Sequence, residues 1–118
     1  MALVLNEEQV MLKDSAAGFL ADRATVAHLR EMRDSGSERG FSDEAWREIA
    51  EMGWCGIAIS EAYGGLGYGY TGLGLVLEQM GRNLTVSPLQ SSILVAATVI
   101  AELGSAQQKE KLLPALAA

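Results

Sequence analysis

The sequence predicts an all-α domain of about six helices, packed as an orthogonal or up-and-down bundle. Three observations lead to this fold class. Apolar residues recur at helical spacing in most segments, good helix caps stand where these segments begin, and no sustained period-two pattern indicates a strand. The chain has 118 residues, which suits one hydrophobic core, so we expect a single domain over residues 1–118.

The first two helices follow from their caps. The Asn6 side chain can accept a hydrogen bond from an amide of the opening turn, and the Gln9 side chain can accept one from the Asn6 amide. This cap predicts the start of a helix, which is expected to run to about Ala21. A shorter helix is expected over residues 25–33. The polar cluster 34–37 then forms a loop.

The third helix lies between a clear start and a clear stop. Ser42 is a good N-cap, and Gly53 can adopt the left-handed conformation that closes a helix. The apolar run 54–60 is expected to be extended or irregular. Six glycines between residues 64 and 74 predict a tight, exposed loop, because glycine reaches backbone conformations closed to other residues.

Three further helices complete the predicted bundle. One is expected over residues 71–81, with Gly81 as its stop. The next covers residues 87–103, opens with a serine cap and a first-turn proline, and is apolar nearly all round, which predicts a central position. The last covers residues 105–113, and Pro114 is expected to kink or end it.

Charge and composition exclude several functions. Fifteen acidic residues against nine basic ones give a net charge of -6, which repels nucleic-acid phosphates and anionic lipids. The longest apolar run, residues 93–101, is far shorter than the roughly 20 residues that cross a bilayer. The lone Cys55 cannot form an internal disulfide. We therefore expect a cytoplasmic protein that binds neither nucleic acid nor membrane.

One glycine motif resembles a nucleotide-binding pattern. Gly67, Gly69 and Gly72 lie in the segment GYGYTG, which matches G-x-G-x-x-G. A functional motif needs a preceding parallel strand and an acidic residue about 20 positions later for the ribose. A helical segment with Ser91 and Ser92 occupies that later region. The motif therefore does not predict a dinucleotide site.

The chain has few groups for catalysis. His28 is the only histidine and has no cysteine nearby to complete a metal site. Cys55 lies in an apolar run and is expected to be a buried structural thiol, and Glu61 is expected to be solvated. We therefore predict no catalytic residue and no metal site.

Three hydroxyl residues interrupt the apolar helix 87–103, namely Ser91, Ser92 and Thr98. Hydroxyls in a helix commonly bond back to carbonyls of their own helix. The alternative is that they line a pocket. The residues alone leave both interpretations open.

Three segments in order, GWCGIAISEAYGGLG, LVLEQMGR and ELGSAQQKEKLLPALA, resemble the N-terminal helical domain of the acyl-CoA dehydrogenase family, from Asn6 to Ala118. The resemblance implies an FAD-dependent oxidoreductase whose subunit adds a middle β-domain and a C-terminal helical domain. FAD would be held mainly between those two domains and a neighbouring subunit. Residues 1–118 alone are then expected to be inactive, with their cofactor contacts unknown.

The same resemblance implies a reaction and partners. A glutamate in the C-terminal domain removes the α-proton of an acyl-CoA while hydride leaves the β-carbon for the flavin. Reduced flavin usually passes its electrons to an electron-transfer flavoprotein, and members form homo- or hetero-oligomers, often dimers of dimers. The segment GRNLTVSPLQSSILVAATVI is similar to actinobacterial members, some of which act on steroid-type acyl-CoAs as unlike subunits. Fatty acid or steroid degradation is the implied setting.

The resemblance also implies a substrate wall. The helix 87–103 would line one side of the acyl pocket, with Ser87, Ser91 and Val95 as substrate-binding residues. The small side chain of Ser91 would leave room for a long or wide acyl group.

Two alternatives remain. One is a stand-alone, non-catalytic helical module that buries its apolar faces by self-association. The other is an acyl-CoA oxidase, in which reduced flavin reacts directly with oxygen. The dehydrogenase hypothesis predicts that the parent chain continues for two domains beyond Ala118.

Overall fold

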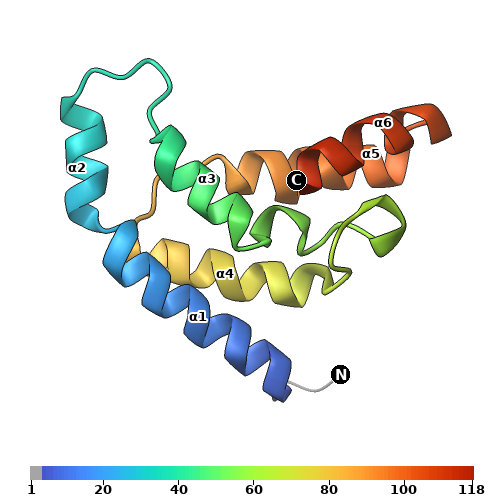
Figure 1. Ribbon diagram of the computed structural model, residues 1–118, viewed down its shortest axis with the longest axis horizontal. Helices are drawn as coiled ribbons and strands as arrows, with labels where there is room; N and C mark the ends of the chain where they lie inside the picture. The colour runs from blue at the N-terminus through green and yellow to red at the C-terminus, as the bar shows by residue number, and fades with distance from the viewer. Residues whose placement is uncertain (1–3) are drawn as a thin grey trace.

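The computed structural model describes residues 4–118, so residues 1–3 of the predicted domain lie outside the described part. Six α-helices form the fold (Figure 1): α1 (Glu7–Arg23), α2 (Val26–Asp34), α3 (Asp43–Glu51), α4 (Gly69–Asn83), α5 (Thr98–Leu103) and α6 (Ala106–Ala117). Three other elements join them: the 3-10 helices η1 (Trp54–Gly56) and η2 (Glu61–Tyr63), and the π-helix η3 (Gln90–Ala97), which continues into α5. Residues 4–118 contain no strand, and the all-α prediction is confirmed.

The helices form a flat body. Its principal extents are 42 × 36 × 20 Å, and the shortest is about two helix diameters. The radius of gyration is 14.7 Å, whereas a compact domain of this length has roughly 13.5 Å. In Figure 1, α1 and α4 lie side by side in one half, and α3, α5 and α6 form the other. A two-layer body of this kind leaves one face of most helices exposed.

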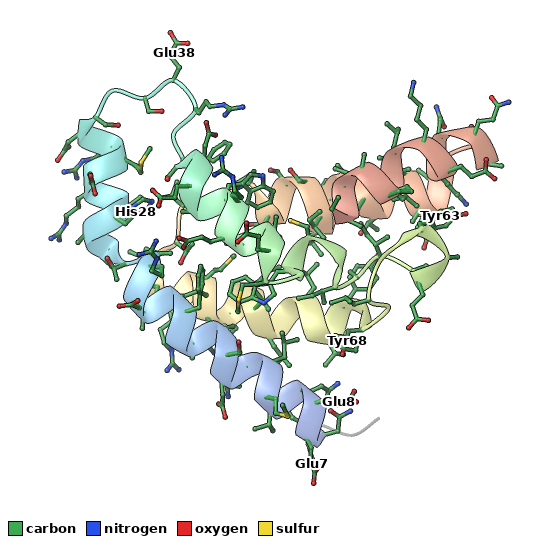
Figure 2. All side chains as sticks on the ribbon, viewed as in Figure 1. Glu7, Glu8, His28, Glu38, Tyr63 and Tyr68 are labelled. Atoms are coloured by element: carbon green, nitrogen blue, oxygen red, sulfur yellow. The ribbon has the colours of Figure 1, made fainter. Side chains whose placement is uncertain are left out.

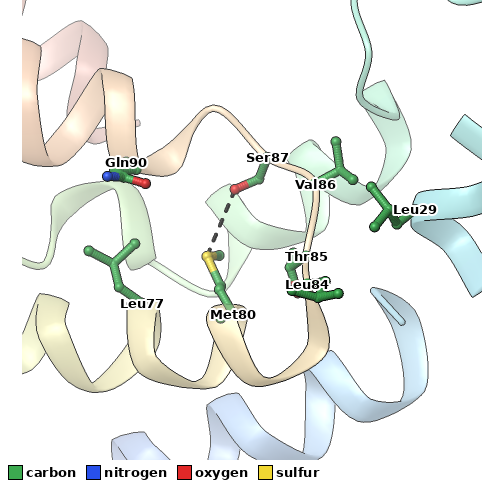
Figure 3. A pocket seen from close by; sticks show the side chains of 9 residues that line it. Leu29, Leu77, Met80, Leu84, Thr85, Val86, Ser87 and Gln90 are labelled. Atoms are coloured by element: carbon green, nitrogen blue, oxygen red, sulfur yellow. Dashed lines mark hydrogen bonds between the residues drawn. The ribbon is translucent and has the colours of Figure 1, made fainter. Parts of the chain in front are cut away.

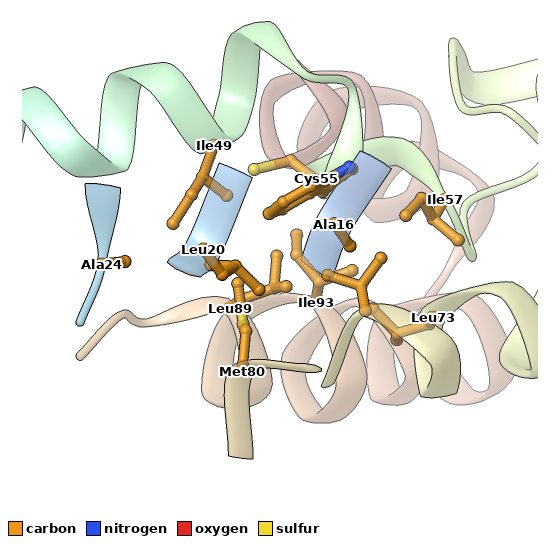
Figure 4. Packing of buried hydrophobic residues seen from close by; sticks show 12 residues of the cluster. Ala16, Leu20, Ala24, Ile49, Cys55, Ile57, Leu73, Met80, Leu89 and Ile93 are labelled. Atoms are coloured by element: carbon orange, nitrogen blue, oxygen red, sulfur yellow. The ribbon is translucent and has the colours of Figure 1, made fainter. Parts of the chain in front are cut away.

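The main core lies between these halves (Figure 4). Trp54 is 1% exposed and meets the edge of Phe19 with ring centroids 5.4 Å apart. Around this pair pack fully buried aliphatic side chains from several elements, including Leu20, Ile49, Leu73, Leu89 and Ile93. A smaller cluster of Ile59, Ala97 and Leu113 ties α6 to the π-helix.

The predicted starts of α1, α3 and α6 are confirmed by their hydrogen bonds. The Gln9 amide donates to the Asn6 side chain at 2.8 Å, and the Asn6 amide donates to the Gln9 side chain at 3.0 Å. Ser105 and Gln108 form the same reciprocal box at α6. The Ala45 amide donates to Ser42 Oγ at α3. These contacts need only neighbouring residues, which explains why the sequence predicts them well.

Acidic side chains gather at the periphery. Figure 2 shows Glu7 and Glu8 at the first turn of α1, where negative charge complements the helix dipole, and Glu38 on the loop that joins α2 to α3. Within residues 4–118, no helix combines the length and apolar character required to span a bilayer.

The predicted stop at Gly81 is wrong. Helix α4 continues to Asn83, and Leu84 takes the left-handed conformation with φ 50° and ψ 45°. The Leu84 amide donates to the Gly81 carbonyl at 3.2 Å, and the Thr85 amide donates to the Met80 carbonyl at 2.9 Å. This pair of bonds is a Schellman-type cap, which normally places glycine where Leu84 stands.

Two other boundaries also differ. Helix α4 begins at Gly69, two residues before the expected Thr71. Helix α6 continues through Pro114 to Ala117. Proline removes one backbone donor, but here it stands in the last turn, and the neighbouring Leu113 is 2% exposed and holds that turn against the core.

The loop between η2 and α4 folds back on the run 54–60, which is irregular as predicted. The Leu66 amide donates to the Gly56 carbonyl at 2.8 Å. A Cβ atom on Gly65 would stand 2.0 Å from the carbonyl oxygen of Ile59. Only glycine allows this close approach of two backbone segments.

Candidate functional site

The helix predicted over residues 87–103 has two different faces. Leu89, Ile93 and Ala97 point into the core, and each is at most 4% exposed. Ser91 and Val95 lie on the outside, where Val95 is 55% exposed. The helix predicted to be central therefore packs into the core with one face only, although its composition is apolar nearly all round.

The outside of this helix continues as a stripe that we call the outer face, made of Ser91, Val95, Val99 and Leu103. Val99 is 51% exposed and Leu103 is 82% exposed. Four-residue steps place these side chains along one side of the helix. Two of the three predicted site residues therefore lie on an apolar surface that the described residues leave uncovered.

The first two turns of this helix are π-helical. Hydrogen bonds of the i→i+5 type widen the turn, and such turns occur often at functional sites. Ser87 lies just before the segment, where its Oγ accepts a hydrogen bond from the Leu89 amide at 3.3 Å. The Pro88 carbonyl accepts hydrogen bonds from both the Ser91 hydroxyl at 3.0 Å and the Ser92 amide at 2.9 Å. The apolar pattern predicts a helix here but does not distinguish a π-helix from an α-helix.

The three hydroxyl residues do not behave alike. Ser91 bonds back to its own helix, as the first interpretation expects. Thr98 Oγ1 instead lies 2.9 Å from the hydroxyl of Tyr70 and so joins α5 to α4. A cavity of about 200 Å³ surrounds this link, and its other walls include Ile59, Tyr63 and Leu113.

A larger groove of about 470 Å³ opens between the end of α4 and the start of the π-helix (Figure 3). We call it the α4 groove. Its lining residues come from α2, α4, the connecting segment and the first residue of η3: Leu29, Leu77, Met80, Gly81, Leu84, Thr85, Val86, Ser87 and Gln90. Of the three predicted site residues only Ser87 lines it, half-buried with its Oγ 3.8 Å from Met80 Sδ. The sequence analysis missed this groove because it depends on how the chain turns between α4 and the π-helix, which the apolar pattern does not show.

The GYGYTG segment does not build a phosphate site. Within residues 4–118 no strand precedes it, and the loop after η2 leads into α4 directly. The Gly67 amide donates to the Ile59 carbonyl at 3.0 Å, and the Tyr68 amide donates to the Ile57 carbonyl at 2.9 Å. These two amides are therefore not available to bind a dinucleotide pyrophosphate.

The ionisable residues singled out from the sequence lie on three different elements: His28 on α2, Cys55 in η1 and Glu61 in η2. His28 is half-buried on α2 (Figure 2), near the ion pair between Arg23 and Glu48 at the surface. Hydrogen bonding to Arg23 lowers the pKa of the Glu48 carboxyl. Glu61 is exposed. No three metal-ligating side chains among residues 4–118 are close enough to share an ion.

Cys55 is a buried structural thiol, as predicted. It is 1% exposed, and desolvation raises the pKa of its thiol to about 11. Because the thiolate is the reactive species, little of it exists near neutral pH.

We expect Cys55 to resist alkylation in the native protein. An iodoacetamide pulse at pH 8, followed by peptide mass spectrometry, should leave Cys55 unmodified in buffer and fully modified in denaturant. Rapid labelling in buffer would show that the thiol is accessible and that its burial is not stable.

The comparisons with known proteins agree on one family. The family model described as "Acyl-CoA dehydrogenase, N-terminal domain" matches residues 6–118. Acyl-CoA dehydrogenase FadE12 of Mycobacterium tuberculosis is 29% identical over 122 residues, covering 98% of this chain and 29% of the relative. Mitochondrial isovaleryl-CoA dehydrogenase of Bos taurus is 32% identical over 114 residues, covering 95% of this chain and 26% of the relative. The chain therefore spans less than a third of the length of these relatives.

Solved structures share the helical arrangement. A chain of the Tcur3481-Tcur3483 steroid ACAD variant has a TM-score of 0.82 at 40% identity, covering 94% of this chain and 30% of that one. A chain of the ChsE4-ChsE5 complex from Mycobacterium tuberculosis has a TM-score of 0.85 at 26% identity, covering 99% of this chain and 32% of that one. The match over residues 6–118 and this common fold show that the chain belongs to the acyl-CoA dehydrogenase family, in which it corresponds to the N-terminal domain.

Proposed function

We propose that this chain forms one wall of the acyl site in an FAD-dependent acyl-CoA dehydrogenase. The outer face carries the proposal, because it presents exposed Ser91, Val95 and Val99 on a helix whose opposite side is locked into the core. A large apolar surface left in water is unfavourable, and a ligand or another domain normally covers it. The acyl part of a thioester has the matching apolar character.

The outer face would act by positioning the acyl group for the reaction. Removal of the α-proton and departure of the β-hydride require the two carbons to be held in register with their acceptors. The residues of the outer face bring no ionisable group to that work, so they would orient the acyl chain and exclude water. FAD, when bound, supplies the acceptor for the hydride. In this proposal, flavin contacts and the catalytic glutamate belong to a middle β-domain and a C-terminal helical domain of the parent enzyme.

The wider assembly is part of the same proposal. The relative named as a steroid ACAD, at 40% identity, supports a bulky acyl group and a role in steroid or fatty acid degradation. The similar chain from a two-component ChsE4-ChsE5 complex supports assembly into an oligomer, either homomeric or with an unlike subunit. We propose an electron-transfer flavoprotein as the electron acceptor and the bacterial cytoplasm as the location. Mycobacterial relatives support the bacterial origin.

Flavin bleaching tests this function. The parent enzyme containing this chain, purified with any unlike subunit, should show flavin absorbance near 450 nm, an approximate position that is general to oxidised flavins. Adding a substrate acyl-CoA without oxygen should bleach that band and yield the α,β-unsaturated thioester. A colourless protein, or one that no acyl-CoA bleaches, would contradict the proposal. Rapid recovery of the band in air, with hydrogen peroxide, would identify an oxidase instead.

A further inference from the structure

We propose that Tyr70 is a positioning residue for the reaction. Its hydroxyl, bonded to Thr98, holds the helix of the outer face at the point where the π-helix η3 passes into α5. This inference rests on the function proposed above. It gives a role in the reaction to a residue of α4 that lies outside the outer face.

The hydrogen bonding of this helix changes at Thr98. Residues 90–97 form the π-helix, and Thr98 is the first residue of α5. The Thr98 amide donates to the Val95 carbonyl, which is only three residues earlier, whereas a π-helix bonds over five. Val95 and Val99 of the outer face flank this change. The direction in which both side chains point therefore depends on where the change occurs.

Packing alone does not hold α5 toward α4. No residue of α5 is buried, and the cavity of about 200 Å³ has Ala97, Thr98 and Ala101 among its walls. Ile100 packs against the smaller cluster that ties α6 to the π-helix, so α5 is held on the side of α6. Within residues 4–118, the 2.9 Å bond between Tyr70 and Thr98 is the one side-chain hydrogen bond from α5 to another element.

The element that carries Tyr70 is well fixed. Tyr70 is the second residue of α4, and the loop before it bonds to the run 54–60 through the amides of Leu66, Gly67 and Tyr68. These amides donate to backbone carbonyls, whose positions do not depend on side-chain rotation. The Tyr70 side chain is 53% exposed, but a tyrosine has only two side-chain torsions and is held at low entropic cost. A rigid element therefore brings the hydroxyl to Thr98.

The link affects the rate of the reaction more than the affinity for substrate. Without the hydroxyl, the outer face keeps the same apolar side chains, so the contact area for an acyl group is preserved. The alignment of the reacting carbons with their acceptors depends instead on where Val95 and Val99 point, and small misplacements slow a reaction strongly.

Stopped-flow bleaching of the flavin tests this role in the full-length enzyme, purified with any unlike subunit. The probe is whichever of butyryl-CoA, palmitoyl-CoA and cholyl-CoA bleaches the parent enzyme without oxygen. We expect Tyr70→Phe and Thr98→Val each to lower the bleaching rate constant at saturating thioester by about two- to tenfold, the range that one hydrogen bond sets. The half-saturating concentration should change by less than about twofold. A residue that only stabilises the fold would not move this rate constant, because it is measured per bound flavin.

Three further variants are matched to these two. Thr98→Ser keeps the hydroxyl and should bleach at the parent rate. Tyr68→Phe should do the same, because Tyr68 is 50% exposed, close to the value for Tyr70, but does not line the cavity beside α5. The double variant Tyr70→Phe, Thr98→Val should be no slower than the slower single variant, since both changes break the same bond.

Three results would overturn the positioning role of Tyr70: losses that multiply in the double variant, equal slowing in Tyr68→Phe, or parent rate constants in both single variants. In each of these cases the parent enzyme still bleaches, so the proposed function stands. If none of the three thioesters bleaches the parent enzyme, the positioning role and the proposed function are both wrong.

Discussion

Ser91→Phe in the full-length enzyme is expected to lower kcat/KM for long or wide acyl-CoAs by about 10- to 100-fold, while short acyl-CoAs lose much less. Ser91 is exposed on the outer face, and its hydroxyl already bonds to the Pro88 carbonyl, so the position offers space rather than a polar contact. An added aromatic ring occupies that space, and steric changes of this kind in apolar pockets produce effects of this size. Steady-state kinetics across a series of acyl lengths measure the profile.

Ser91→Ala is the matched control. It removes the hydroxyl without adding volume, and the bond that it loses lies within the helix, so the acyl-length profile should stay as it was. If Ser91→Phe leaves the profile unchanged while the enzyme keeps its flavin, this position does not line the acyl site. The wall then lies on a different face of the helix.

Gly65→Ala is expected to destabilise the protein by about 2–4 kcal/mol, the range of severe backbone clashes. A Cβ atom there would stand 2.0 Å from the Ile59 carbonyl oxygen and 2.4 Å from its carbonyl carbon. Both are backbone atoms, which no side-chain rotation can move aside. The loop between η2 and α4 would have to separate from the run 54–60, with loss of bonds such as that from the Leu66 amide to Gly56.

Gly18→Ala serves as the control for this loss of stability. Gly18 lies in α1, and a Cβ atom added there meets nothing within 4 Å. Alanine in a helix is favoured over glycine by about 1 kcal/mol, so this variant should be as stable as the parent or more stable. Thermal or denaturant unfolding measures both changes. A Gly65→Ala protein of normal stability would mean that the two segments do not approach as closely as described.

The helix starts could be predicted because their causes are local. Asn6, Ser42 and Ser105 bond to amides within three residues, and this information lies in the sequence around each position. One helix end depends on distant packing, because Pro114 remains helical beside Leu113, which is held in the core. The end of α4 is local, but its cap places Leu84 where glycine is usual, so the sequence pattern favoured Gly81 instead.

The candidate site was only partly predictable. Ser91 and Val95 were placed by resemblance to a family, and the structure adds that they are exposed on one face. The α4 groove lies mostly within residues 77–90, but its hollow depends on the path of the chain between α4 and the π-helix, which the sequence pattern does not show. Leu84, three residues after Gly81, is the one unusual residue beside the groove. It is recognised as unusual only when its positive φ is known.

The π-helix η3 has a consequence for the evolution of this surface. A wider turn holds more residues, so the helix that follows depends on how many residues η3 contains. Deleting a single residue from 92–97, with the π-helical turns kept, would rotate everything downstream by about 80° around the helix axis, because a turn closed by i→i+5 bonds holds roughly 4.4 residues. Val99 and Leu103 would leave the line of Ser91 without any change in their identity. Homologous chains that differ here by one residue in length would therefore present different surfaces from nearly the same sequence.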